Sequence, residues 1–149
     1  MEYQMKRVEL GTVTADIGPK ADNPRNSEGT FLQLADGEIL FVYSRFRGDS
    51  SADQAFADLS LMRSRDGGRT WGEDQVILTY EGEKGVNMMC PALLMMQNGD
   101  VGLFYLVRLT YSRTQIFLRR SSDGGRTWGE RVVCTPQEDF FVMNNDRVV

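Results

Sequence analysis

A ten-residue sequence occurs twice in the chain and constrains its fold more than any other feature. Residues 64–73 read Ser-Arg-Asp-Gly-Gly-Arg-Thr-Trp-Gly-Glu, and residues 121–130 repeat them with a single change, serine for the first arginine. A sequence that returns on this scale indicates a repeated supersecondary unit, which cannot bury its apolar face alone and packs against its neighbours. The chain is therefore expected to be built from consecutive copies of one such unit.

The repeated unit extends beyond these ten residues. The turn signal Asp36-Gly37 is matched by Asn98-Gly99, and the apolar run that ends at Arg45 is matched by the run that ends at Arg108. Asp-Gly and Asn-Gly are strong signals of a tight β-hairpin. On this alignment, Arg45 and Arg108 stand at equivalent strand ends.

Each unit reads as four short strands that are rich in β-branched and aromatic residues and are bounded by turn residues. The expected strands span residues 29–34, 38–45, 57–64 and 75–79 in the first unit and residues 91–97, 101–109, 114–121 and 131–134 in the second. Repeated units of four strands joined by hairpins are the blades of a β-propeller. We therefore predict an all-β partial propeller with a lead-in over residues 1–22 that holds a lone strand at residues 6–14, one blade over residues 23–86, a second over residues 87–143 and the start of a third at residues 144–149.

The repeated turn has a structural explanation. An aspartate in a turn accepts hydrogen bonds from the backbone amides that follow it, and glycine adopts positive φ at little cost. The tryptophan that ends each copy is expected to pack its ring against the strands of its own blade. A structural role, not a catalytic one, is therefore predicted for Ser64, Asp66, Gly68, Trp71, Ser121, Asp123, Gly125 and Trp128.

Composition disfavours several functional classes. The formal net charge of −4 argues against nucleic acid and anionic membranes as partners, and no apolar run is long enough to span a membrane. The chain has no histidine and only two cysteines, Cys90 and Cys134, so we predict no metal and no cofactor. The first residues lack the apolar stretch of a secretory signal, which predicts a cytoplasmic protein.

The pattern Ser-x-Asp-x-Gly-x-x-Trp, present twice, resembles the Asp-box (BNR) repeat of sialidases. Residues 23–29, 43–49 and 144–149 are similar to segments of bacterial sialidase-like proteins, the predicted neuraminidases. The resemblance implies a six-bladed propeller, of which this chain is the first part, and a glycoside hydrolase that acts on terminal sialic acid or another acidic sugar. It also implies a nucleophilic tyrosine and an activating glutamate on later blades, so the site in this chain is expected to be incomplete and inactive.

The order of the strands predicts where a site would lie. When strands alternate in direction, both Asp boxes lie at one end of the blades, and the loops after the second and fourth strands lie at the other end, near the propeller axis. The long loop over residues 46–56 belongs to that second end. The resemblance places a carboxylate-binding arginine at Arg25 and an acid/base aspartate in the long loop, at Asp49 or Asp53. Further substrate-binding candidates at this end are Glu28, Arg45, Arg47, Asn145, Asp146 and Arg147.

Other interpretations stay open at this point. Arg25 and Glu28 also suit a structural role, in which they hold the start of the blade through backbone hydrogen bonds. Asp58 is expected to be a strand-edge residue and not a catalyst. The whole chain also suits a carbohydrate-binding propeller without hydrolysis, or a protein-interaction propeller, which the polar loops disfavour. Blade faces and strand edges without a neighbour predict self-association.

Overall fold

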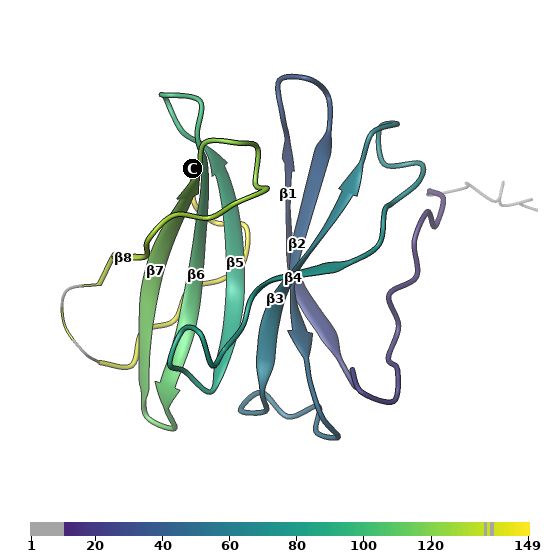
Figure 1. Cartoon of the computed structure of the whole chain (residues 1–149). Helices are drawn as coiled ribbons and strands as arrows, with labels where there is room; N and C mark the ends of the chain where they lie inside the picture. Colours follow the sequence, from purple (N-terminus) through teal and green to yellow (C-terminus); the bar gives the residue numbers. More distant parts are fainter. Residues whose placement is uncertain (1–10, 136, 138) are drawn as a thin grey trace, which may run out of the picture.

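The computed structural model describes residues 11–135, 137 and 139–149, and this part of the chain contains strands and no helix (Figure 1). The first group of strands comprises β1 (Asn26–Gln33), β2 (Ile39–Phe46), β3 (Ala57–Ser64) and β4 (Gln75–Leu78), and the second comprises β5 (Asn87–Met95), β6 (Val101–Thr110), β7 (Arg113–Ser121) and β8 (Val132–Val133). Neighbouring strands within each group are antiparallel, and a parallel bridge between Ala57 and Asn87 joins the groups. Two consecutive four-stranded units of this kind are blades of a propeller, which confirms the predicted fold class.

All eight expected blade strands are present, and the two inner strands begin earlier than expected. β1 and β5 each contain a shift of register, a β-bulge, against the neighbouring strand. The bulges contain Glu28 and Cys90, both with a φ of 55°. A bulge interrupts the alternation of side chains along a strand, and that alternation is the signal by which the start of a strand is recognised in a sequence.

The apolar core lies between the two blades. Leu40, Val42 and Leu59 of the first blade form one fully buried cluster with Leu103 and Tyr105 of the second. Alternate residues of a strand point to one face of its sheet, so each blade presents such a row to its neighbour. Since burying one large apolar side chain contributes about 1.5–3 kcal/mol, this shared face is the main apolar contribution to stability.

The Asp boxes and the predicted site lie at opposite ends of the blades. Figure 1 shows the β1–β2 turn and the box-containing β3–β4 and β7–β8 connections at the upper end, and the β2–β3 and β6–β7 loops at the lower end. The order of strands therefore places the candidate loops as the sequence predicts.

Both Asp boxes are held by the same pattern of hydrogen bonds. The Asp66 carboxylate accepts bonds from the backbone N–H groups of Arg69 (3.0 Å) and Thr70 (2.9 Å) and from the Thr70 hydroxyl (2.7 Å), and the Ser64 hydroxyl donates to it at 2.9 Å. The second box repeats each of these bonds. Hydrogen bonds from Thr70, of which the one from its backbone N–H has the largest effect, favour the ionised carboxylate and lower the pKa of Asp66 to about 2. The aspartate is thus occupied by its own turn.

The two tryptophans pack differently. Trp71 lies beside Phe31 and Phe41 of its own blade, with ring centroids 6.0 and 6.1 Å apart, as expected. Trp128 packs against the core cluster that both blades share. The second box therefore contributes to the contact between blades.

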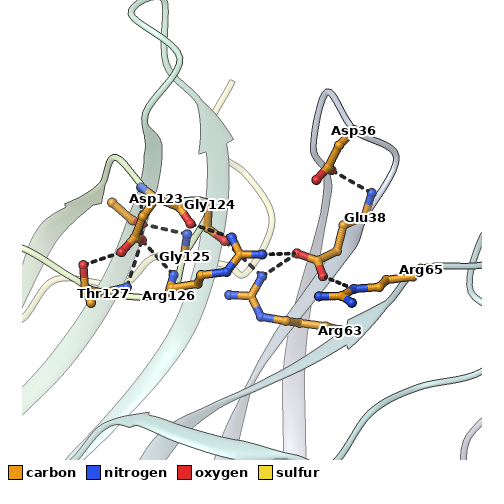
Figure 2. Close-up of polar contacts among 10 residues, drawn as sticks. Asp36, Glu38, Arg63, Arg65, Asp123, Gly124, Gly125, Arg126 and Thr127 are labelled. Atoms are coloured by element: carbon orange, nitrogen blue, oxygen red, sulfur yellow. Dashed lines mark hydrogen bonds and ion pairs between the residues drawn. The ribbon is translucent and has the colours of Figure 1, made fainter.

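A buried carboxylate joins the second Asp box to the first blade (Figure 2). Arg63 Nη1 donates to Glu38 at 2.8 Å and to the carbonyl oxygen of Gly124 at 3.0 Å. Arg65 donates to the same carboxylate at 3.0 Å, and Arg126 of the second box lies 3.7 Å from it. Burial alone would raise the pKa of Glu38, but the guanidiniums of Arg65 and Arg63 outweigh burial and lower it. Glu38 is therefore an ionised link between the blades.

The assumed equivalence of Arg45 and Arg108 is wrong by one residue. Val42 pairs with Thr30 in the first blade, and Phe104 pairs with Ala92 at the corresponding place in the second. Counting from these pairs makes Phe46 the counterpart of Arg108. Both apolar runs end in arginine, which makes the shifted alignment look equally good in the sequence.

The expected lone strand at residues 6–14 is not found in the part of it that the structure describes. Residues 11–14 are not a strand, and residues 6–10 lie outside the described residues. Thr14 nevertheless contacts the first blade, since its hydroxyl accepts a hydrogen bond from the Trp71 indole at 3.2 Å. Within the described ranges, no helix is long and apolar enough to cross a membrane.

Candidate functional site

Arg25 lies directly before β1 and reaches into the long β2–β3 loop. Its Nη1 is 2.5 Å from the Asp53 carboxylate and donates to the Ser51 carbonyl oxygen at 3.2 Å. The guanidinium also stacks on the Phe46 ring, 4.5 Å from the ring centroid. The cation is therefore oriented by an aromatic face and by the loop, and its side chain keeps 29% of its surface exposed.

Arg25 lines one cleft, and its partner Asp53 lines a second. The larger, of about 620 Å³, lies between the segment at residues 15–19 and the residues from Pro24 to Gly29, and includes Arg25 and Ser51. The smaller, of about 190 Å³, is lined by Asp53, Cys90, Arg108 and the segment at residues 140–144. Glu28 lines both clefts, so these two openings share one carboxylate.

Glu28 also has a structural task. Its carboxylate accepts a hydrogen bond from the backbone N–H of Cys90 at 2.7 Å and so ties the inner strand of the first blade to that of the second. Burial and the adjacent carboxylate raise the pKa of the Cys90 thiol to about 12. A thiol in this state is a poor nucleophile.

Two polar residues of the C-terminal segment hold β1. The Asn145 amide donates to the Gly29 carbonyl oxygen at 2.9 Å, and the Asp146 carboxylate accepts a bond from the Thr30 hydroxyl at 2.8 Å. Arg147 is exposed. Asn145 and Asp146 are thus engaged in holding the segment next to the first blade, a task that their sequence context did not reveal.

Arg45 and Arg47 form a different group from Arg25. Arg45 lies 3.7 Å from Asp74, and Arg47 lies 3.3 Å from Asp58. Both arginines line a third cleft, of about 410 Å³, whose lining includes neither Arg25 nor Glu28. The structure therefore brings Arg25, Glu28 and Asp53 together and places Arg45 and Arg47 beside the outer strands.

The two candidate acid/base residues are on the surface, and a third carboxyl is buried. Asp49 is exposed, and the side chain of Asp53 is 70% exposed. Asp58, in contrast, is 1% exposed, and burial raises its pKa despite a hydrogen bond from the backbone N–H of Tyr80. Burial therefore favours the protonated form of Asp58, against the ion pair with Arg47, although its sequence context predicted a strand-edge residue and not a catalyst. Its position two residues after the long loop was the available signal.

Tyr105 and Glu83 form a tyrosine–glutamate pair in the interior of the protein. The Tyr105 hydroxyl donates to Glu83 at 2.9 Å, and Arg119 and Arg131 also bind this carboxylate, at 2.7 and 3.0 Å. Tyr105 is fully buried, and burial together with Glu83 raises its pKa. Tyr105 is therefore not an accessible nucleophile.

Two buried polar atoms near the smaller cleft have no hydrogen-bond partner. They are Nε of Arg108, which lines that cleft, and Oδ1 of Asn87, whose amide nitrogen donates to the Asp53 carbonyl oxygen at 2.7 Å. The Arg108 guanidinium also lies over the Phe140 ring. Unsatisfied buried donors are uncommon in folded proteins, and this one belongs to a guanidinium that lines the smaller cleft. Among the described residues, no cluster of three His, Cys, Asp or Glu side chains is arranged to hold a metal ion.

Comparison with protein families matches residues 38–144 to the BNR repeat-like domain. A comparison with curated proteins gives no significant match.

Solved structures with the same fold include several carbohydrate-related enzymes. Hadza microbial sialidase Hz136 has a TM-score of 0.63 at 23% identity, over 75% of this chain and 26% of that chain. A mutant of Trypanosoma rangeli sialidase that displays trans-sialidase activity has a TM-score of 0.56 at 16% identity, over 86% of this chain and 24% of that one. Penicillium chrysogenum α-L-arabinanase, in complex with arabinobiose, has a TM-score of 0.52 at 24% identity, over 74% and 33%. The chain thus spans a third or less of these structures, and the likeness concerns the fold.

Proposed function

Because this chain belongs to the family of BNR repeat-like domains, we propose that the end of its blades opposite the Asp boxes binds an acidic sugar, as part of a sialidase-type glycoside hydrolase. The ligand class is a terminal sialic acid or another sugar that carries a carboxylate. Within this proposal, Arg25 binds the carboxylate, while Glu28 lies in position to accept hydrogen bonds from sugar hydroxyl groups.

The observation that carries the proposal is the environment of Arg25. Its guanidinium is held on the Phe46 ring beside a cleft of about 620 Å³ and is paired with a mostly exposed carboxylate, Asp53. A ligand carboxylate can displace such an exposed partner at small cost, because exposed ion pairs contribute little, about 0–1 kcal/mol. Arg108, which lines the smaller cleft, supplies a second guanidinium there. Two guanidiniums near two clefts suit a planar anionic group better than a neutral sugar.

A second candidate function is carbohydrate binding without hydrolysis. It is supported by the burial of Tyr105, which keeps the Tyr105–Glu83 pair away from a substrate, and by the exposure of Asp49 and Asp53, the two acid/base candidates of the long loop. On either function, the isolated 149-residue chain is expected to bind sugar and to hydrolyse none.

The test is calorimetric titration of the chain with N-acetylneuraminic acid, accompanied by a fluorogenic sialoside assay for hydrolysis. Binding in the millimolar range is expected, with a loss of about tenfold or more in Arg25→Ala, because one charge-assisted contact contributes about 1.5–3 kcal/mol. Arg69→Ala is the matched control, since Arg69 is an exposed arginine at the opposite end of the same blade. Equal affinity for galactose, or equal loss in both variants, would remove the acidic-sugar site from this end.

Two other candidate arginines suggest how the proposal can be refined. Arg45 and Arg47 lie beside the third cleft, so their replacement by alanine is expected to change affinity less than Arg25→Ala does.

The cytoplasmic location expected from the first residues stays a prediction.

A further inference from the structure

The ion pair between Arg25 and Asp53 shows that this guanidinium accepts a carboxylate. Arg25 Nη1 lies 2.5 Å from Oδ1 of Asp53, and the same nitrogen donates to the Ser51 carbonyl oxygen at 3.2 Å. A carboxylate at this distance makes a charge-assisted hydrogen bond, which is stronger than a bond between neutral groups. One carboxylate of the protein therefore uses a donor that a ligand carboxylate would also use.

Arg25 is oriented by contacts other than this pair. Its guanidinium stacks on the ring of Phe46, which is fully buried in a cluster with Met89 of the second blade. The amide of Asn23, which is 3% exposed, donates to the carbonyl oxygens of Arg25 at 3.0 Å and of Phe46 at 2.8 Å. These contacts fix the backbone and one face of the guanidinium, so Arg25 stays in place when Asp53 turns away.

The backbone of Asp53 is held, whereas its carboxylate reaches into solvent. Asn87 of β5, which is fully buried, donates from Nδ2 to the carbonyl oxygens of Asp53 at 2.7 Å and of Ala55 at 3.1 Å. The Asp53 side chain is nevertheless 70% exposed. A rotation about its side-chain bonds therefore releases the carboxylate from Arg25 while the loop keeps its contacts with the second blade.

We infer that Asp53 is an internal competitor for the ligand carboxylate at Arg25 and thereby a specificity-determining residue, an inference that rests on the proposed function. The carboxylate of an acidic sugar takes the place of the Asp53 carboxylate at Nη1 of Arg25, and the Asp53 side chain turns away. A neutral sugar has no anion to exchange, so it meets a guanidinium that is already paired.

The exchange also makes the Asp53 carboxyl available to the ligand. Arg25 lines the larger cleft, Asp53 lines the smaller one, and Glu28 lines both. Because Asn87 holds the backbone of Asp53, the released carboxyl group stays where the two clefts approach each other. Binding of an acidic sugar thus frees one of the two acid/base candidates beside the sugar, and binding of a neutral sugar leaves it paired.

The exposure of the pair sets the size of the effect. The side chains of Arg25 and Asp53 are 29% and 70% exposed, so solvent screens their attraction. Exposed ion pairs of this kind contribute little, and exchange with Asp53 therefore lowers the affinity for an acidic sugar by about fivefold at most.

The test is titration of the 149-residue chain with N-acetylneuraminic acid, followed by nuclear magnetic resonance, for the wild type, Asp53→Asn and Asp22→Asn. Asparagine keeps the shape of Asp53 and removes the competing charge, so the dissociation constant of Asp53→Asn is expected to fall about two- to fivefold. Asp22→Asn is the matched control, because it makes the same change of charge three residues before Arg25 at a side chain that is 81% exposed. Its affinity is expected to equal that of the wild type.

The carboxyl carbon signal of Asp53 reports the exchange itself. In the wild type, this signal is expected to shift when the acidic sugar is added and to stay in place when galactose is added. In Arg25→Ala, it is expected to shift in the same direction without any sugar, since the pair is then absent.

The outcomes separate this inference from the proposed function. Binding by Asp53→Asn that is equal to or weaker than that of the wild type, an equal gain in Asp22→Asn, or an Asp53 signal that does not move at saturation would each overturn the inference alone. Absence of binding in all three proteins would overturn the proposed function and this inference with it. Circular dichroism of each variant confirms that it is folded.

Discussion

Glu38→Gln tests the ionised link between the blades. The bond from Arg63 is the strongest contact, since the two side chains are only 20% and 4% exposed, and a charge-assisted bond of this kind contributes about 1.5–3 kcal/mol. The contacts from Arg65 and Arg126 involve side chains that are 79% and 54% exposed, so each contributes about 1 kcal/mol at most. Glutamine keeps the volume and one acceptor, and we therefore expect the free energy of unfolding to fall by about 2 kcal/mol at pH 7.

The pH dependence of this loss identifies its cause. The folded pKa of Glu38 is lowered, so its ionised form stabilises the protein above its unfolded pKa, and that contribution is lost as the pH falls through the lower folded value. The difference between the wild-type chain and Glu38→Gln is therefore expected to shrink below about pH 4. Urea denaturation at pH 7 and at a pH below about 4 measures this difference, as a change of the denaturation midpoint with an unchanged slope. A cost of Glu38→Gln no greater than that of the exposed control Glu130→Gln, or a difference that persists undiminished in acid, would contradict an ionised link at Glu38.

Three further substitutions test other parts of the structure. Glu83→Gln is expected to cost about 3 kcal/mol or more, because it leaves two arginines without their buried carboxylate; thermal denaturation measures this, and a cost below 1 kcal/mol would show that the network is dispensable. Thr30→Val keeps the side-chain volume at a fully buried position but removes the acceptor for the Leu93 N–H and the donor to Asp146 in the C-terminal segment. The free energy of unfolding is therefore expected to fall by about 1–3 kcal/mol. Thr12→Val, at an exposed position, is the control, and equal stability of the two variants would contradict these contacts. Asp66→Asn is expected to make stability depend less on pH in acid. The lowered pKa of Asp66 means that its ionised form stabilises the wild-type protein above about pH 4 and that this contribution is lost as the pH falls toward 2. Circular dichroism during acid titration measures the effect, and identical titration curves for the variant and the wild type would argue against it.

The repeated turn and the hairpin signals made the fold predictable. Turn chemistry and alternation are local, and they marked all eight blade strands and the end of the blades at which Arg25 lies. The first residues of β1 and β5 could not be predicted from the sequence, because the bulges at Glu28 and Cys90 depend on pairing with the next strand and not on the local sequence alone.

The site was only partly predictable for a related reason. Sequence order places Arg25, Arg45 and Arg47 at one end of the blade, but it does not reveal how far each lies from the axis or which carboxylate it meets. The burial that raises the pKa of Asp58 likewise comes from the packing of strands and loops around it, which the local sequence of a strand edge does not reveal.

The acidic-sugar site is tested most directly by following the backbone amide signals of the isotopically labelled chain while N-acetylneuraminic acid is added, with galactose as the neutral comparison. The acidic sugar is expected to shift signals at residues 25–29 and around Arg108, and galactose is expected to shift them much less. Shifts confined to the Asp boxes, or equal responses to both sugars, would contradict an acidic-sugar site at the opposite end of the blades.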